Sequence, residues 1–282
     1  MIAVVVALSV ILFWSYWPTF VEMVGRWEID PQYSHGYLVP LFALALLVIR
    51  LKQADLGKFL PSWWGFPLLL SGVALRHAGT YFFYLWFDPI SLIPCLSGIC
   101  LLLGGRRLLR VALPSIVFLF FMIPLPFSLE SALRAPLQGV GTLVSTYLMQ
   151  TIGLPAISEG NVIVVNDNRI GVVEACSGLR MLMVFFALST AVAFLIQRPN
   201  WERVVVILSS VPIALISNIA RITVTGILYV TTSSEWAEYV FHDLAGWLMM
   251  PFGLFLLWIE LKFLSKLWIV EEKQPLALGF ET

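Results

Sequence analysis

The stretch Glu174-Ala175-Cys176-Ser177-Gly178-Leu179-Arg180 joins a polar segment to an apolar run at residues 177–196. A run of about 20 apolar residues is long enough to cross a bilayer as an α-helix. The stretch therefore predicts the start of a membrane span, with a thiol, a hydroxyl and a guanidinium group at one membrane surface. Residues 217–221 (Ser-Asn-Ile-Ala-Arg) and 241–247 (Phe-His-Asp-Leu-Ala-Gly-Trp) lie near the ends of two later apolar runs.

The composition is that of an integral membrane protein. The chain of 282 residues is 60% hydrophobic and 12% charged, and its formal net charge is zero. A soluble domain normally carries about 25% charged residues. The zero net charge gives no basic surface of the kind that binds nucleic acid, so we expect no nucleic-acid partner.

Eight apolar runs are candidate spans by their length. They are residues 2–21, 36–51, 64–83, 87–104, 110–127, 177–196, 203–224 and 244–265. Strands of a membrane β-barrel alternate between apolar and polar residues, and these runs do not. The sequence predicts an all-α polytopic membrane protein with about eight transmembrane helices. We expect one domain over residues 1–268 and a cytoplasmic tail at 269–282.

Lysines and arginines gather in alternate connections between the predicted spans. One set of connections holds Arg50, Lys52, Lys58, Arg106, Arg107, Arg110, Arg198, Arg203, Lys262, Lys266 and Lys273. The other set holds only Arg26, Arg134 and Arg169. Because basic residues are enriched on the cytoplasmic side, we expect both termini inside the cell. Residues 22–35, 84–89, 128–176 and 225–243 then face outward.

The long outer segment, residues 128–176, has two predicted parts. Residues 128–151 scatter polar groups among apolar ones after Pro124 and Pro126, which predicts an amphipathic helix at the outer interface. Two β-branched runs, 161–165 and 170–174, flank an Asn/Asp turn and predict a short β-hairpin. This hairpin would lead directly into Cys176.

The three cysteines indicate neither a disulfide framework nor a metal centre. Their number is odd and no metal-ligand spacing is present. Cys95 and Cys100 share one apolar run and are interpreted as packing residues. The chain also has no Gly-rich phosphate loop, no His-Glu-x-x-His and no Gly-x-Ser-x-Gly pattern. We expect no metal and no cofactor.

Cys176 has two interpretations, a packed thiol at a helix start or a nucleophile. The N-terminus of a helix presents free N–H groups and a partial positive charge. Both features favour the thiolate, since an unperturbed thiol with a pKa near 8.5 is only slightly ionised at neutral pH. The N–H groups that follow at Ser177 and Gly178 could also hold an oxyanion.

Arg221 and His242 are the expected partners of this thiol. Arg221 either reaches outward to lipid headgroups or faces the bundle, where it would pair with a thiolate or an oxyanion. Asn218, one helical turn before it, could orient it. His242 either caps a helix beside Asp243 or acts as general acid and base, for which a pKa near 6.5 is suited.

Several further polar residues could support the site. His35 lies on the outer side and could serve as the base or bind substrate. Arg76 and His77 fall within a predicted span and either pair structurally or line a substrate groove. Glu174 and Arg180 flank Cys176, and Arg180 is a second candidate cation because it lies one turn away on the same predicted helix face.

Taken in this order, residues 174–180, 218–222 and 242–247 resemble the exosortases, and residues 33–40 (Tyr-Ser-His-Gly-Tyr-Leu-Val-Pro) are similar to their N-terminal region. The resemblance covers about residues 30–250. It implies a multispan cysteine enzyme of the bacterial inner membrane, related to the archaeosortases, with its site facing the periplasm. Carried over, Cys176 is the nucleophile, Arg221 the stabilising cation and His242 the acid and base.

The resemblance also implies the partners, beyond the lipid bilayer itself. The substrates would be secreted proteins that end in a Pro-Glu-Pro motif, a transmembrane helix and a basic tail. The enzyme would form a thioacyl intermediate near the motif and transfer the protein to an acceptor that the sequence does not identify. Two alternatives remain: a protease with water as acceptor, and a non-enzymatic transporter or polysaccharide-assembly subunit with Arg76, His77 and Arg221 along a polar path.

Overall fold

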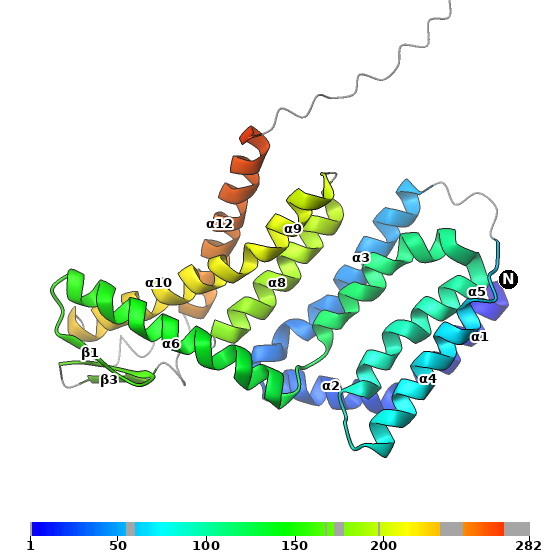
Figure 1. Cartoon of the computed structure of the whole chain (residues 1–282), viewed down its shortest axis with the longest axis horizontal. Coiled ribbons are helices and arrows are strands. Elements are labelled where there is room, and N and C mark those ends of the chain that lie inside the picture. The colour runs from blue at the N-terminus through cyan, green and yellow to red at the C-terminus, as the bar shows by residue number, and fades with distance from the viewer. Residues whose placement is uncertain are drawn as a thin grey trace, which may run out of the picture.

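The computed structural model describes residues 2–54, 60–166, 168–171, 178–196, 198–231 and 245–267 (Figure 1). Its α-helices are α1 (Ile2–Ser15), α2 (Trp17–Ile29), α3 (Leu38–Gln53), α4 (Gly65–Tyr81), α5 (Phe87–Phe118), α6 (Phe127–Thr151), α8 (Gly178–Leu195), α9 (Asn200–Leu208), α10 (Ser210–Thr231) and α12 (Ala245–Leu267). Two 3₁₀ segments are η1 (Pro31–Tyr37) and η2 (Leu119–Met122). The strands are β1 (Ala156–Glu159), β2 (Val162–Val165) and β3 (Asn168–Gly171). The all-α polytopic class is confirmed.

The predicted count of eight spans is not supported. In the described residues, five helical segments are long and apolar enough to cross a membrane. They are Pro31–Gln53, Phe87–Met122, Gly178–Leu195, Asn200–Thr231 and Leu248–Lys266. A sixth is obtained if the bent pair Ala7–Ser15 and Trp17–Ile29 is one broken span.

The helices bend where the sequence pattern suggested that they end. The predicted spans 87–104 and 110–127 lie mainly in the single element α5, which is kinked at Gly105 (φ 68°, ψ −162°). A Cβ atom at Gly105 would collide with the carbonyl oxygen of Leu60, so only glycine fits this bend. Figure 1 shows α5 running beside α4, turning, and returning beside α3. The predicted span 64–83 is α4, whose 17 residues reach only about 25 Å.

The first predicted span is broken at Tyr16, where α1 and α2 meet at 57°. Pro18 stands in the first turn of α2, where its missing N–H costs least. Arg76 of α4 donates to both the side chain and the carbonyl of Ser15, each at 2.7 Å. The same guanidinium pairs with Asp88 of α5 at 2.8 Å. This network satisfies the polar groups at the break.

Residues 127–171 form α6 and a three-stranded antiparallel sheet of order β1-β2-β3. The predicted helix and the predicted hairpin of β2 and β3 are both confirmed. The additional strand β1 pairs Glu159 with Val162 across a tight turn in which Gly160 has φ 62°. The sheet buries Ile163 and Val165 against Met149 of α6.

The elements sort toward two ends of the molecule (Figure 1). The sheet, α6, α2 and the turn between α4 and α5 lie toward one end, called here the sheet end. The C-terminal ends of α3 and α12, the bend of α5 and the junction of α8 with α9 lie toward the opposite end. Helix α8 begins, and α10 finishes, toward the sheet end. Two of the stretches with candidate chemistry meet near this end in their described parts, because the Asn218 amide of α10 packs on Gly178 at the start of α8. Residues 174–177 and 241–244 lie outside the described residues.

Candidate functional site

The predicted site residues divide into two groups. Cys176, His242, Glu174 and Ser177 lie outside the described residues. Asn218, Arg221, Arg180, His35, Arg76 and His77 are described.

Asn218, a residue of α10, packs against the first residue of α8. Its side chain is 2% exposed, and its amide nitrogen would lie 3.1 Å from a Cβ atom at Gly178 and 3.3 Å from one at Gly141. Gly178 is the first residue of α8, and Gly141 is in the middle of α6. The two glycines let α6 and α8 approach α10 closely enough to hold the Asn218 amide between them.

Arg221 lies one turn further along α10, on the same face as Asn218. Its side chain is 8% exposed. The buried residues of α10 include Ser217, Asn218, Ile222 and Thr225, so this face is the one that packs against α6 and α8. Of the two sequence interpretations of Arg221, its burial favours the one in which it faces the bundle.

Arg180 and His35 gather near Arg221. Arg180, half-buried on α8, is close enough to Arg221 for their positive charges to repel, and Asp30 provides an opposing negative charge. His35 is on η1, close enough to Arg180 to be affected by that charge. Segments far apart in the sequence thus bring two cations and an imidazole to the start of α8.

The His35 ring is enclosed by protein. Both ring nitrogens are buried, and although backbone groups of Gln32 and Phe121 lie beside the ring, neither nitrogen makes a hydrogen bond of good geometry with a described residue. The next residue, Gly36, packs so closely on the indole of Trp27 that a Cβ atom would clash. The Trp27 indole in turn donates to the Met122 carbonyl at 2.9 Å.

Segment η1 is anchored to α6 by polar side chains. The Tyr33 hydroxyl donates to a Glu130 carboxylate oxygen at 3.2 Å and accepts from the Leu125 N–H at 3.2 Å. Arg134 pairs with Glu130 and donates to the Gln32 side-chain oxygen at 3.0 Å. Neither Glu130 nor Arg134 is among the site residues predicted from the sequence. Their i,i+4 spacing on a predicted helix was the available signal.

Arg76 and His77 do not join this cluster. Arg76 is used in the ion pair with Asp88, and its guanidinium stacks 4.4 Å from the ring centroid of Tyr16. These contacts favour the structural interpretation of Arg76 over a role in lining a substrate groove. His77 is exposed on α4.

Comparison with protein-family models gives one match, to the transmembrane exosortases, over residues 27–259. The chain belongs to the transmembrane exosortase family. The matched region contains all three chemistry-bearing stretches and the cluster around His35, Arg180 and Arg221. This family is linked to the processing of sorting signals, and its members are generally cysteine transpeptidases. Neither the curated proteins nor the solved structures gave a match to this chain.

Proposed function

We propose that this exosortase is a membrane-embedded cysteine peptidase and transpeptidase that cleaves the C-terminal sorting signals of secreted proteins. Cys176 is the nucleophile, Arg221 the cation that stabilises negative charge, and His242 the general acid and base. The observation that supports this most is the burial of Arg221 one turn from Asn218, whose amide packs on Gly178. Gly178 follows Cys176 by two residues.

Chain connectivity limits how far the thiol can be from Arg221. Consecutive Cα atoms are 3.8 Å apart, so the Cα atom of Cys176 lies within about 7.6 Å of that of Gly178. Arg221 is about 4.5 Å along the axis of α10 from Asn218, which contacts Gly178. These lengths are compatible with direct contact between the guanidinium and the sulfur.

The proposed reaction has two acyl transfers. The Cys176 thiolate attacks the scissile carbonyl, and Arg221 with backbone N–H groups of α8 stabilises the resulting oxyanion. The C–N bond then breaks as protonated His242 donates to the leaving amine, which leaves a thioacyl enzyme. His242 next takes a proton from the acceptor nucleophile as it attacks the thioester. The Cys176 thiolate is released beside the again protonated His242, and the secreted protein is joined to the acceptor, or to water if hydrolysis occurs.

The proposed orientation places this site at the periplasmic face. Basic residues gather at the opposite end, where Arg50 and Lys52 occupy the last turn of α3 and Lys266 the last turn of α12. Positively charged ends favour the cytoplasm. A substrate held by a transmembrane helix with a basic tail would obey the same rule. Its cleavage motif would then be presented at the sheet end.

The test uses cells that express this protein together with a secreted reporter ending in a Pro-Glu-Pro motif, a transmembrane helix and a basic tail. We expect reporter processing with the intact chain and with Cys100→Ala, and none with Cys176→Ala at equal membrane abundance. Cys100 is a half-buried thiol of α5 and controls for the general effect of removing a cysteine. Continued processing by Cys176→Ala would exclude the thiol mechanism.

A further inference from the structure

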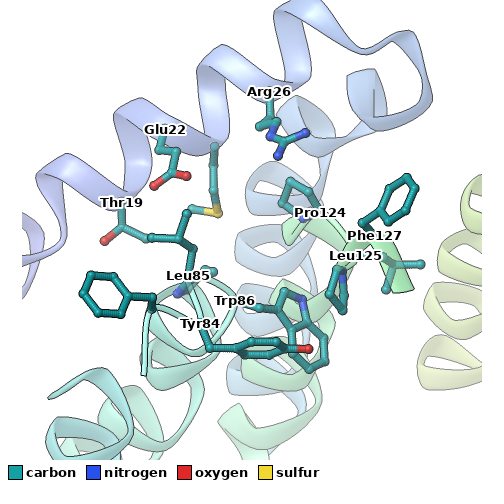
Figure 2. Close-up of a pocket in the computed structure, with 13 residues that line it drawn as sticks. Thr19, Glu22, Arg26, Tyr84, Leu85, Trp86, Pro124, Leu125 and Phe127 are labelled. Atoms are coloured by element: carbon teal, nitrogen blue, oxygen red, sulfur yellow. The ribbon is translucent and has the colours of Figure 1, made fainter. Parts of the chain in front are cut away.

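A cavity of about 220 Å³ lies between α2 and two turns of the sheet end (Figure 2). It does not include the cluster around Arg221. One wall comes from α2, the second from the turn between α4 and α5, and the third from the extended stretch before α6. Its lining includes Glu22, Arg26, Phe83, Tyr84, Trp86 and Phe127.

The α2 wall carries one negative and one positive charge. Glu22 and Arg26 are four residues apart and so lie on one side of the helix. Figure 2 shows both side chains on the side of α2 that faces the turn with Tyr84 and Trp86. Despite their spacing, neither belongs to an ion pair with any described residue. The cavity therefore presents two separated charges of opposite sign.

The facing wall is aromatic. The rings of Tyr84 and Trp86 lie opposite α2 in Figure 2. The Trp86 indole N–H is buried and has no hydrogen-bond partner in the described part of the chain. Phe83 has φ 55°, a conformation that is unusual for a bulky residue. Aromatic faces attract cations, most strongly ammonium groups held between several rings.

The rim of the cavity is apolar and faces outward from the protein. Phe83 is 90% exposed, and Tyr81, Phe82, Leu85 and Phe127 are also largely exposed. Such a cluster at one end of a helical bundle is typical of the level of the lipid headgroups. A membrane lipid fits this rim, with its acyl chains outside the cavity and its headgroup inside.

We propose that this cavity binds the headgroup of a zwitterionic phospholipid of the phosphoethanolamine type. Arg26 holds the phosphate, while Glu22 and the faces of Tyr84 and Trp86 hold the ammonium group. The two charges of α2 match the two opposite charges of one headgroup. This inference is independent of the proposed thiol chemistry and of the proposed orientation in the membrane.

The test measures lipid binding to the full-length chain in detergent by native mass spectrometry. The probes are dihexanoyl phosphatidylethanolamine and dihexanoyl phosphatidylglycerol, which share the phosphate but differ in the ammonium group. We expect the ethanolamine lipid to bind about 5-fold more tightly than the glycerol lipid. This factor corresponds to ~1 kcal/mol, the contribution of one partly exposed charge pair between Glu22 and the ammonium group. We expect Glu22→Gln to abolish this preference and Arg26→Gln to weaken the binding of both lipids.

Two matched variants control for general charge effects. Glu28→Gln removes an exposed carboxylate from the same helix but outside the cavity, and Arg169→Gln removes an exposed guanidinium from β3. Both are expected to bind the two lipids as the unmodified chain does. The proposal is overturned if the unmodified chain binds both lipids equally. It is also overturned if Glu28→Gln removes the preference as fully as Glu22→Gln.

Discussion

Replacing the glycines around Asn218 tests whether its position determines activity. A Cβ atom at Gly178 would lie 3.1 Å from the Asn218 amide nitrogen, and one at Gly141 would lie 3.3 Å from it. Gly139, also in α6, has no atom within 4 Å of the position that a Cβ would occupy. The three alanine variants therefore add the same methyl group to a helix, but only two of them push on Asn218.

The expected magnitudes follow from two opposing terms. Alanine in place of a helical glycine stabilises by up to about 1 kcal/mol. Overpacking a tight contact costs about 1–3 kcal/mol. Gly139→Ala thus raises the thermal stability of the protein or leaves it unchanged. Gly141→Ala and Gly178→Ala lower it or leave it unchanged, because the cost of overpacking equals or exceeds the gain in helix stability.

Activity should separate the variants more clearly than stability does. A catalytic group displaced by about 1 Å can lose about 100-fold in rate, so the shift of a few tenths of an ångström needed here corresponds to about 10-fold. We expect Gly178→Ala and Gly141→Ala to slow reporter processing by about that factor, and Gly139→Ala to retain it. Thermal stability in detergent is measured on the same samples. Equal processing by all three variants would refute a role for the Asn218 position.

Two further predictions concern the N-terminal half of the chain. Asp88→Asn removes the ion pair between Asp88 and Arg76, whose two side chains are 28% and 27% exposed, respectively. We expect the free energy of unfolding to fall by about 2 kcal/mol, a value between those of exposed and buried ion pairs. Thermal unfolding checks this, with Glu159→Gln as the exposed-pair control expected to cost less than about 1 kcal/mol. Phe83→Gly releases about 1–2 kcal/mol of left-handed backbone strain and should raise the melting temperature. A lowered melting temperature for Phe83→Gly would contradict this account of the turn.

Short-range patterns predicted the local elements well. The hairpin of β2 and β3 was predicted from two β-branched runs around an Asn/Asp turn, and the two strands pair in antiparallel orientation as expected. The strand β1 was missed because Ala156–Glu159 has a weak strand composition. The tight turn at Gly160 and Asn161 was the signal that could have identified it.

The number of spans was harder to predict because a helix can bend without ending. Gly105 and the break at Tyr16 change the path of the chain, yet apolar residues continue through both places. Hydropathy alone does not distinguish a kink from a loop. The partners of Arg76 could not be predicted either, because Ser15 and Asp88 lie on other helices and no sequence spacing links them to α4.

The candidate site was predictable where one helical turn connects its residues and not where tertiary contacts do. The three-residue spacing of Asn218 and Arg221 correctly placed both on one face of α10. By contrast, the anchoring of η1 by Glu130 and Arg134 joins residues about 100 positions apart. Such polar contacts stabilise the fold because a buried polar group is costly unless it is hydrogen-bonded.

The electrostatics of the cluster give a reason for its proposed chemistry. Arg180 and Arg221 repel each other, and two like charges, one half-buried and the other buried, are unfavourable unless an anion lies near them. Asp30 supplies part of that compensation from η1, and the segment is held in place by its bonds to α6. In the proposed mechanism, the positive charges of Arg180 and Arg221 would favour the thiolate of Cys176 over the thiol. The anchoring of η1 would matter to this mechanism because it holds Asp30, whose negative charge opposes that of Arg180.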